Sequence, residues 1–172
     1  RNELGAIAVC HGFLDAQIEY AAEGRDGNPA GIYAAKLLSS PNKHDGLYWK
    51  TAEGETPSPA GDEVAAAAEE GYRAAGANGE RMPYHGYYYR MLFAQGPNAH
   101  GGASEYFSGG QLTQGVALLA WPAEYGVSGV MTFMINHEGV IYEKDLGDNT
   151  DAEAAKIDTF NQDGSWSSDK SE

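Results

Sequence analysis

The chain has 172 residues, enough for one domain with a sizeable hydrophobic core. Its 42% hydrophobic and 21% charged residues indicate a globular protein and exclude a disordered one. The net charge of −14 disfavours nucleic acid and anionic membrane surfaces as partners.

The first predicted element is a helix. From Asn2 to Glu23 apolar residues recur at steps of three and four, which is typical of an amphipathic helix. The predicted core stripe consists of Leu4, Ile7, His11, Leu14, Ile18 and Ala21. Cys10 is the only cysteine, and we expect it to be buried filler and not a reactive thiol. Because the chain starts at Arg1 without methionine, we expect a processed or trimmed product.

The middle of the chain alternates breakers and short helical patterns. Ile32–Ser40 predicts a short helix that ends at Pro41. The stretch "HDGLYWK" carries a turn and an aromatic pair, and Thr51–Gly61 predicts an irregular loop. Asp62–Gly79 predicts an alanine-rich helical turn or two that Gly71 interrupts.

The second half is rich in β-branched and aromatic residues. It predicts four strands, at Tyr84–Ala94, Gly115–Trp121, Val127–Asn136 and Val140–Lys144. "NHEG" predicts a tight hairpin turn, and "GGASEYFSGGQLTQG" a flexible loop. The resulting class is α+β, with a long N-terminal helix packed on an antiparallel four-stranded meander sheet. We expect a single domain over residues 1–146, followed by an acidic polar tail over 147–172.

The aromatic stretch "PYHGYYYRMLFA" raises the question of a binding site. In a strand, alternate residues share a face. We expect one face to belong to the core, with His85, Tyr87, Tyr89, Met91 and Phe93. We expect the other to be half covered, with Tyr84, Tyr88, Arg90 and Leu92. Tyr84, Tyr88 and Arg90 are therefore the candidate ligand-binding residues, and a two-sided structural strand is the alternative.

The segment "EKDLGDNTDAE" carries the candidate metal ligands. Asp145, Asp148, Asn149 and Asp151 place hard oxygen atoms at short intervals, which suits Ca²⁺. The segment lacks the spacing of an EF-hand, and a solvated turn with a helix cap is the alternative. Apart from calcium, we expect no cofactor.

Catalytic motifs are absent from the sequence. The five histidines form no HExxH pattern, no GxSxG nucleophile motif occurs, and no glycine-rich stretch has phosphate-loop spacing. His85 and His100 flank the aromatic strand and could converge with Asp45 or Glu138. We predict that the protein is not an enzyme.

Four stretches together resemble a bacterial family, the domain-of-unknown-function family 2950. They are "RNELGAIAVCHGFLDAQIEYA", "LLSSPNKHDGLYW", "PYHGYYYRMLFAQGPNAHGGA" and "ALLAWPAEYGVSGVMTFMINHEGVIYEKDLG". The resemblance runs from Asn2 to about Gly147. Members of that family look like exported proteins with a signal peptide and a further N-terminal region. The resemblance therefore implies a periplasmic or extracellular bacterial location and a C-terminal fragment, and it implies no activity.

A more distant resemblance joins the helix to type IV pilins and pseudopilins. Asn2-Glu3, Ala6-Ile7, Ala16-Gln17 and Tyr20 are similar to the soluble half of the long pilin helix. This resemblance implies a pilin-like fold, and calcium in a C-terminal loop as in pseudopilins. A pilin helix starts with a membrane-spanning apolar half, which is missing before Arg1, and we expect no membrane insertion of this chain.

Two functions follow as expectations. The first is a non-enzymatic exported structural or interaction domain that self-assembles into an envelope complex or extracellular filament. Its partner would be a second copy of the chain or another envelope protein. The alternative is a small-molecule or calcium-binding module of the cell envelope.

Overall fold

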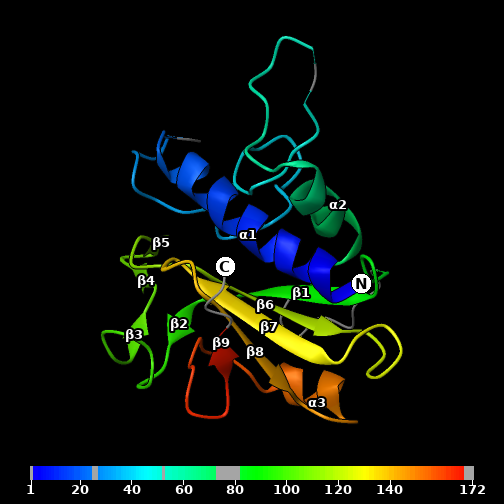
Figure 1. Cartoon of the computed structure of the whole chain (residues 1–172). Coiled ribbons are helices and arrows are strands. Elements are labelled where there is room, and N and C mark those ends of the chain that lie inside the picture. The colour runs from blue at the N-terminus through cyan, green and yellow to red at the C-terminus, as the bar shows by residue number, and fades with distance from the viewer. Residues whose placement is uncertain (1, 25–26, 52, 73–81, 169–172) are drawn as a thin grey trace.

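The fold has three layers around one antiparallel sheet. The computed structural model describes residues 2–24, 27–51, 53–72 and 82–168. Helix α1 (Asn2–Ala21) lies across one face of the sheet, and α2 (Asp62–Glu70) packs beside α1. Helix α3 (Thr150–Ala155) lies against the opposite face (Figure 1). Within the described residues, no helix is both long and apolar enough to cross a membrane.

The main sheet has five strands, all antiparallel to their neighbours. Their order is β1 (Tyr87–Leu92), β6 (Ala117–Pro122), β7 (Met131–Asn136), β8 (Ile141–Asp145) and β9 (Ser167–Ser168). Two short ribbons pair β2 (Ala94–Gln95) with β3 (Ser104–Glu105), and β4 (Phe107–Ser108) with β5 (Gln111–Leu112). The α+β class is confirmed. The prediction of four strands is wrong, because β9 adds a fifth strand beside β8.

Helix α1 forms where it was predicted, but it buries a different face. Leu4 is 71% exposed and Ile18 is 57% exposed, so the predicted core stripe is wrong for these two residues, whereas Ile7 and Leu14 are half-buried and pack against the core. The residues that α1 does bury are Ala6, Val9, Cys10, Phe13, Ala16, Gln17 and Tyr20. At 3.6 residues per turn, this set lies about a third of a turn from the predicted stripe.

Small side chains explain this orientation of α1. Ala6, Cys10 and Ala16 let the helix backbone approach the sheet closely, while Phe13 fills the remaining space. Gly12 lies against α2, because a Cβ atom there would stand only 3.0 Å from the Cγ2 atom of Val64. A pattern of aliphatic residues alone does not reveal such close contacts. The prediction that Cys10 is buried is confirmed.

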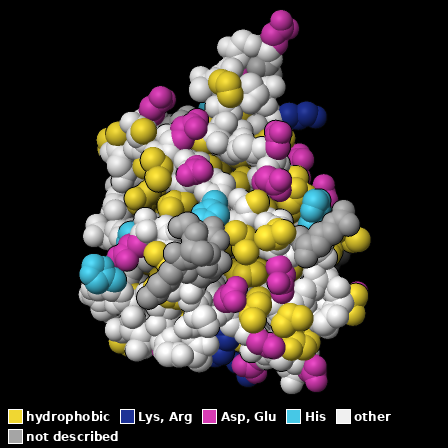
Figure 2. All heavy atoms as spheres, viewed as in Figure 1, with side chains coloured by type: hydrophobic (Ala, Val, Ile, Leu, Met, Phe, Trp, Pro, Cys, Tyr) yellow, Lys and Arg dark blue, Asp and Glu magenta, His cyan; other side chains and the backbone are white. Residues whose placement is uncertain are grey.

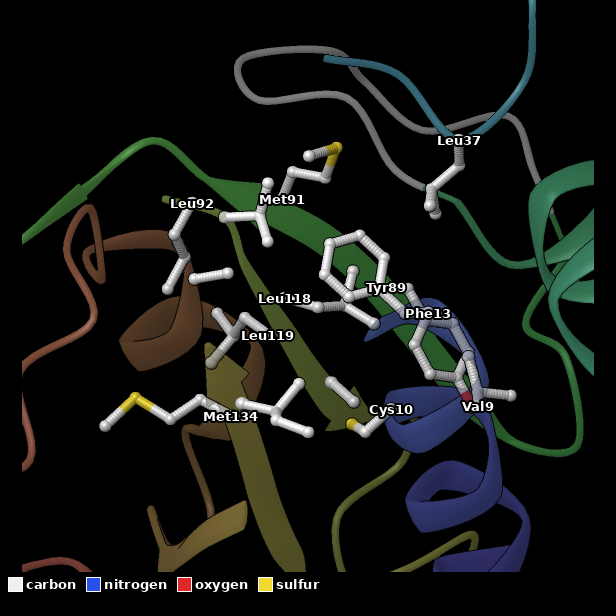
Figure 3. Close-up of a cluster of buried hydrophobic side chains, with 14 of the residues drawn as sticks. Val9, Cys10, Phe13, Leu37, Tyr89, Met91, Leu92, Leu118, Leu119 and Met134 are labelled. Carbon is white, nitrogen blue, oxygen red and sulfur yellow. The ribbon is translucent and has the colours of Figure 1, made fainter. Parts of the chain in front are cut away.

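Strand β1 is central and covered on both faces. It starts after a two-residue turn, in which His85 and Gly86 have φ of 50° and 81° and Tyr84 pairs with Tyr87. Figure 3 shows Tyr89 beside Phe13 of α1, and Tyr87 and Met91 share its face by the alternation of the strand. On the opposite face, Arg90 reaches the C-terminal segment. The two-sided aromatic strand is confirmed from Tyr87 onward. His85 is exposed, because the turn removes it from the alternation.

Of the other local predictions, some are confirmed and others are wrong. Helix α2 ends at Gly71 as expected, and the rest of the predicted segment to Gly79 lies outside the described residues except for Tyr72. The "NHEG" turn is confirmed by the hydrogen bond from Gly139 N–H to Asn136 O, 2.9 Å. The helix predicted at Ile32–Ser40 does not form, and the glycine-rich loop contains β3, β4 and β5.

The irregular segment after α1 is fixed by a buried amide. Gln17 is fully buried, and its Nε2 atom donates to Ala34 O while its Oε1 atom accepts from Ala34 N–H, both at 2.8 Å. This side chain satisfies both backbone groups of Ala34, as a neighbouring strand would. It therefore holds the chain of residues 33–35 in place without a helix or strand there.

We predict that Phe13→Ala destabilises the domain by about 3–5 kcal/mol, because the ring is fully buried between α1 and the sheet. Leu4→Ala on the same helix should cost less than about 0.5 kcal/mol. Urea unfolding of both variants gives the comparison. Similar losses from the two substitutions would contradict the observed orientation of α1.

Candidate functional site

A polar groove of about 540 Å³ is the candidate site. It is lined by residues 38–44, by Tyr48–Lys50 and by Glu55 and Glu69. Residues 38–50 come from the irregular segment between α1 and α2, Glu55 from the loop that projects from the top of the molecule in Figure 1, and Glu69 from α2. The groove therefore lies where three separate parts of the chain meet.

The loop at the groove is held in shape by its own hydrogen bonds. Ser40 N–H donates to Asp45 Oδ1 at 2.7 Å, and Gly46 N–H donates to Ser39 Oγ at 2.8 Å. Lys36 Nζ lies 3.1 Å from Asp45 Oδ2 and also donates to Ser40 Oγ. Burial acts to raise the pKa of Asp45, but the hydrogen bonds from Ser40 and Lys36 outweigh it and lower that pKa below its ordinary value. The loop conformation needs no ligand.

Aromatic rings form the inner part of the groove. The ring of His44 stacks on that of Trp49, with centroids 3.8 Å apart and planes 7° from parallel. Trp49 is buried, and its Nε1 atom donates to Thr56 O at 3.0 Å, which fixes the base of the projecting loop. The Tyr20 hydroxyl on α1 donates to His44 O at 3.2 Å. The aromatic part of the groove is therefore anchored to α1.

The charged side chains of the groove differ in whether they bond to another residue of the chain. The Tyr48 hydroxyl donates a hydrogen bond to the Glu69 carboxylate. Burial, followed by this carboxylate, raises the pKa of Tyr48. Glu55 also has an interaction partner. Lys43 and Lys50 line the groove as well, and within the described part of the chain neither forms an ion pair. The groove thus presents two ammonium groups with no carboxylate bound to them there.

The three predicted ligand-binding residues do not form one site. Tyr84 donates to Glu63 Oε1 of α2 at 3.0 Å, and burial together with Glu63 raises its pKa to about 12. Arg90 lies on the other face of the sheet, where Nη2 donates to Ala154 O at 2.6 Å and Ile157 O at 2.9 Å. The rings of Tyr88 and Trp121 are 5.8 Å apart, and the Arg90 guanidinium lies 5.8 Å from the same Trp121 ring. Arg90 therefore anchors the segment at α3.

The four predicted calcium ligands have separate neighbours. Asp145 Oδ1 accepts from the Tyr125 hydroxyl at 2.7 Å and from Gly147 N–H at 2.9 Å, while Asp151 Oδ1 accepts from Trp121 Nε1 at 2.8 Å. Asn149 precedes α3 as its N-cap residue, and Asp148 is exposed. Among the described residues, no three His, Cys, Asp or Glu side chains come close enough together to hold a metal ion.

A second polar cluster joins two distant loops. His100 Nδ1 and Glu138 Oε2 are 2.9 Å apart, so this histidine meets one of the carboxylates considered for it from the sequence. Beneath the pair, Tyr106 donates to Gln95 Oε1 at 3.0 Å, and Gln95 Nε2 donates to His100 O and Gly102 O. The cluster pins the loop after β2 to the β7–β8 turn, and the histidine and glutamate themselves are exposed.

Comparison with known proteins decides the family. The family model described as "Protein of unknown function (DUF2950)" matches residues 1–168. The chain belongs to this family. No curated protein and no solved structure matches the chain. The resemblance to pilins therefore has no support beyond the residues that suggested it.

The groove of this DUF2950 domain was not identified from the sequence. Its residues occur in "SSPNKHDGLYWK", where two lysines flank an aromatic pair in an otherwise acidic chain. That local concentration of basic and aromatic residues is the signal that could have revealed it. The partners Glu55 and Glu69 could not have been assigned, because the fold alone brings them beside Tyr48.

We predict that Asp45→Asn destabilises the domain at neutral pH by up to about 1 kcal/mol, since the carboxylate is partly exposed and its ion pair is weak. The folded-state pKa of Asp45 is lowered, so the stabilisation is complete above the ordinary aspartate pKa of about 3.9. It should disappear as the pH falls through the lower folded-state pKa. Urea unfolding of both proteins between pH 7 and pH 2 measures the difference, and a difference independent of pH would contradict this role.

Proposed function

We propose that this DUF2950 domain is a non-enzymatic binding module of the bacterial cell envelope, in the periplasm or outside the cell. Its ligand site is the groove between residues 38–50, Glu55 and Glu69. The observation that carries the proposal is a preformed groove, with loop geometry fixed by Asp45, Ser39 and Gln17. A groove of this size is within the range of small-molecule sites.

Two features of the described residues support a function without catalysis. Burial raises the pKa of the Cys10 thiol to about 12, so this thiol is a poor nucleophile at neutral pH. The His100–Glu138 pair is exposed to water, and no described cysteine or serine side chain forms a hydrogen bond to it. Binding is therefore the activity that the geometry supports best.

Tyr48→Ala tests the groove directly. We expect two-dimensional NMR spectra of the ¹⁵N-labelled domain, recorded with pools of sugars, amino acids and short peptides, to change mainly at residues 38–50. The substitution should lower the affinity for any compound found in this way by about tenfold, because it removes a groove wall and the hydrogen bond between Tyr48 and Glu69.

Tyr125→Ala is the matched control. Tyr125 is also partly exposed and also donates to a carboxylate, that of Asp145, but it lies outside the groove. Its replacement should leave the affinity unchanged. Spectral changes that cluster elsewhere, or equal losses from both variants, would refute the groove as the binding site.

Self-association is a second candidate function, and one observation favours it. Leu4 and Ile18 form an exposed apolar ridge on α1, flanked by Ile7 and Leu14, which pack against the edge of the core. Leu4 and Ile18 are mostly exposed, and Ile7 and Leu14 are half-buried. Figure 2 shows hydrophobic side chains among scattered acidic ones on the face where α1 lies. A second copy of the chain would cover this ridge only by overcoming the repulsion of two chains of charge −14.

We predict a mass above that of the monomer by light scattering at high protein concentration and physiological salt, where repulsion is screened beyond about 8 Å. Leu4→Asp with Ile18→Asp should restore the mass of the monomer, since both changes place charge on the ridge. Phe107→Ser, an exposed aromatic residue on β4, is the control and should not change the mass. A monomer at every concentration would exclude this function.

A further inference from the structure

The distribution of positive charge singles out the groove. The described residues include six lysines and arginines: Lys36, Lys43, Lys50, Arg90, Lys144 and Lys156. Three of the six belong to the segment of residues 36–50 that builds the groove. The groove lining itself holds Lys43 and Lys50 with Glu55 and Glu69, so its formal charge is balanced in a chain whose net charge is −14.

The cations outside the groove lining have structural partners. Arg90 donates to two backbone carbonyl groups, and Lys36 pairs with Asp45. The ammonium group of Lys144 lies over the Trp166 ring at 5.9 Å, and Lys156 Nζ lies 3.4 Å from Glu153 Oε2. Lys43 and Lys50 have no such role within the residues that the structure describes. Their charges are therefore available to a ligand.

Other polar side chains of the groove can also donate hydrogen bonds to a ligand. Glu69 accepts a hydrogen bond from the Tyr48 hydroxyl, and Glu55 has a partner, so both carboxylates are engaged. Ser39 Oγ accepts from Gly46 N–H, which leaves its own proton to donate. Asn42, exposed at the rim with φ of 63°, adds an amide that can donate two hydrogen bonds. Two ammonium groups, a hydroxyl and an amide are suited to a ligand rich in acceptor oxygens.

We infer that the groove binds a sugar that carries a carboxylate or phosphate group, with Lys43 and Lys50 on the anion and Ser39 and Asn42 on the hydroxyls. This inference rests on the proposed binding function and names its ligand class. Ammonium groups bind carboxylate and phosphate as charge-assisted donors. The half-buried ring of Tyr48 provides an apolar surface for the carbon atoms of the sugar.

The charge of the whole chain limits the size of this ligand. At physiological salt an exposed charge acts over about 8–10 Å. A small anion in the groove is therefore governed by the charges of the lining, and it can lie against Lys43 and Lys50 while Glu55 and Glu69 bond to other groups. A long polyanion such as nucleic acid would extend over the acidic surface and be repelled. The groove selects a short acidic sugar over a charged polymer.

Titration calorimetry of the intact domain with three probes tests the inference. They are trigalacturonic acid, which carries carboxylates, glucose 6-phosphate, which carries a phosphate, and neutral maltotriose. We expect at least one of the two anions to bind about tenfold more tightly than maltotriose. Binding of trigalacturonic acid alone indicates a carboxylate ligand, and binding of glucose 6-phosphate alone indicates a phosphate ligand.

Paired variants identify the residues responsible. Lys43→Gln with Lys50→Gln should weaken binding of the anion about tenfold or more and leave maltotriose unaffected. Lys144→Gln with Lys156→Gln removes the same charge from a different surface and should change neither affinity. Both pairs are surface substitutions, and unchanged melting temperatures verify that the proteins are folded.

Two results would overturn the inferred ligand class, and only the second would also overturn the proposed binding function. If maltotriose binds in the groove as tightly as the anions and the Lys43/Lys50 variant is unchanged, the ligand class is wrong while the groove remains a binding site. If no compound in the NMR pools and none of the three probes perturbs residues 38–50, the proposed function fails together with the inference.

Discussion

The segment that builds the groove is joined to α1 through a fully buried amide, that of Gln17. The described residues between 32 and 60 form no helix and no strand of the main sheet, and short backbone contacts such as that of Leu38 with Tyr48 join them. Gln17 ties this segment to α1 by satisfying both backbone groups of Ala34. A buried amide without partners would cost free energy, so the helix and the segment fix each other. Leu37 and Leu47, both fully buried, then anchor the chain on either side of the loop that carries Lys43.

Burial on both faces of the sheet restricts where chemistry can occur. The face of β1 toward α1 holds Tyr87 and Tyr89, whose phenol pKa values burial raises far above neutral pH. On the other face Arg90 is committed to the backbone of α3 and the residues after it. The aromatic strand therefore stabilises the fold, and the groove receives its polar groups from the irregular segment instead. A rigid scaffold with functional residues on its loops is the common arrangement in proteins.

The sequence predicts the elements of this fold better than their contacts. Helix α1, the end of α2 at Gly71 and the four long strands follow from local patterns of apolar residues and glycine. The buried face of α1 does not, because close packing favours Ala6 and Cys10 over the larger Leu4 and Ile18. The groove is harder still, since Glu69 and Tyr48 are 21 positions apart and meet only through tertiary packing. Likewise, the pairing of β9 with β8 brings an acidic tail into the sheet that its composition does not suggest.

Helix α1 connects the two surfaces to which we assign functions, yet it keeps them physically separate. Gln17 and Tyr20 lie on its buried face and hold the segment that forms the groove. Leu4 and Ile18 lie on its outer face and are not among the residues that line the groove. Substitutions on the outer face therefore change no hydrogen bond that shapes the groove. The proposed binding in the groove and the proposed association through the ridge therefore use different faces of one helix, and substitutions at sites that share no partners have additive energetic effects.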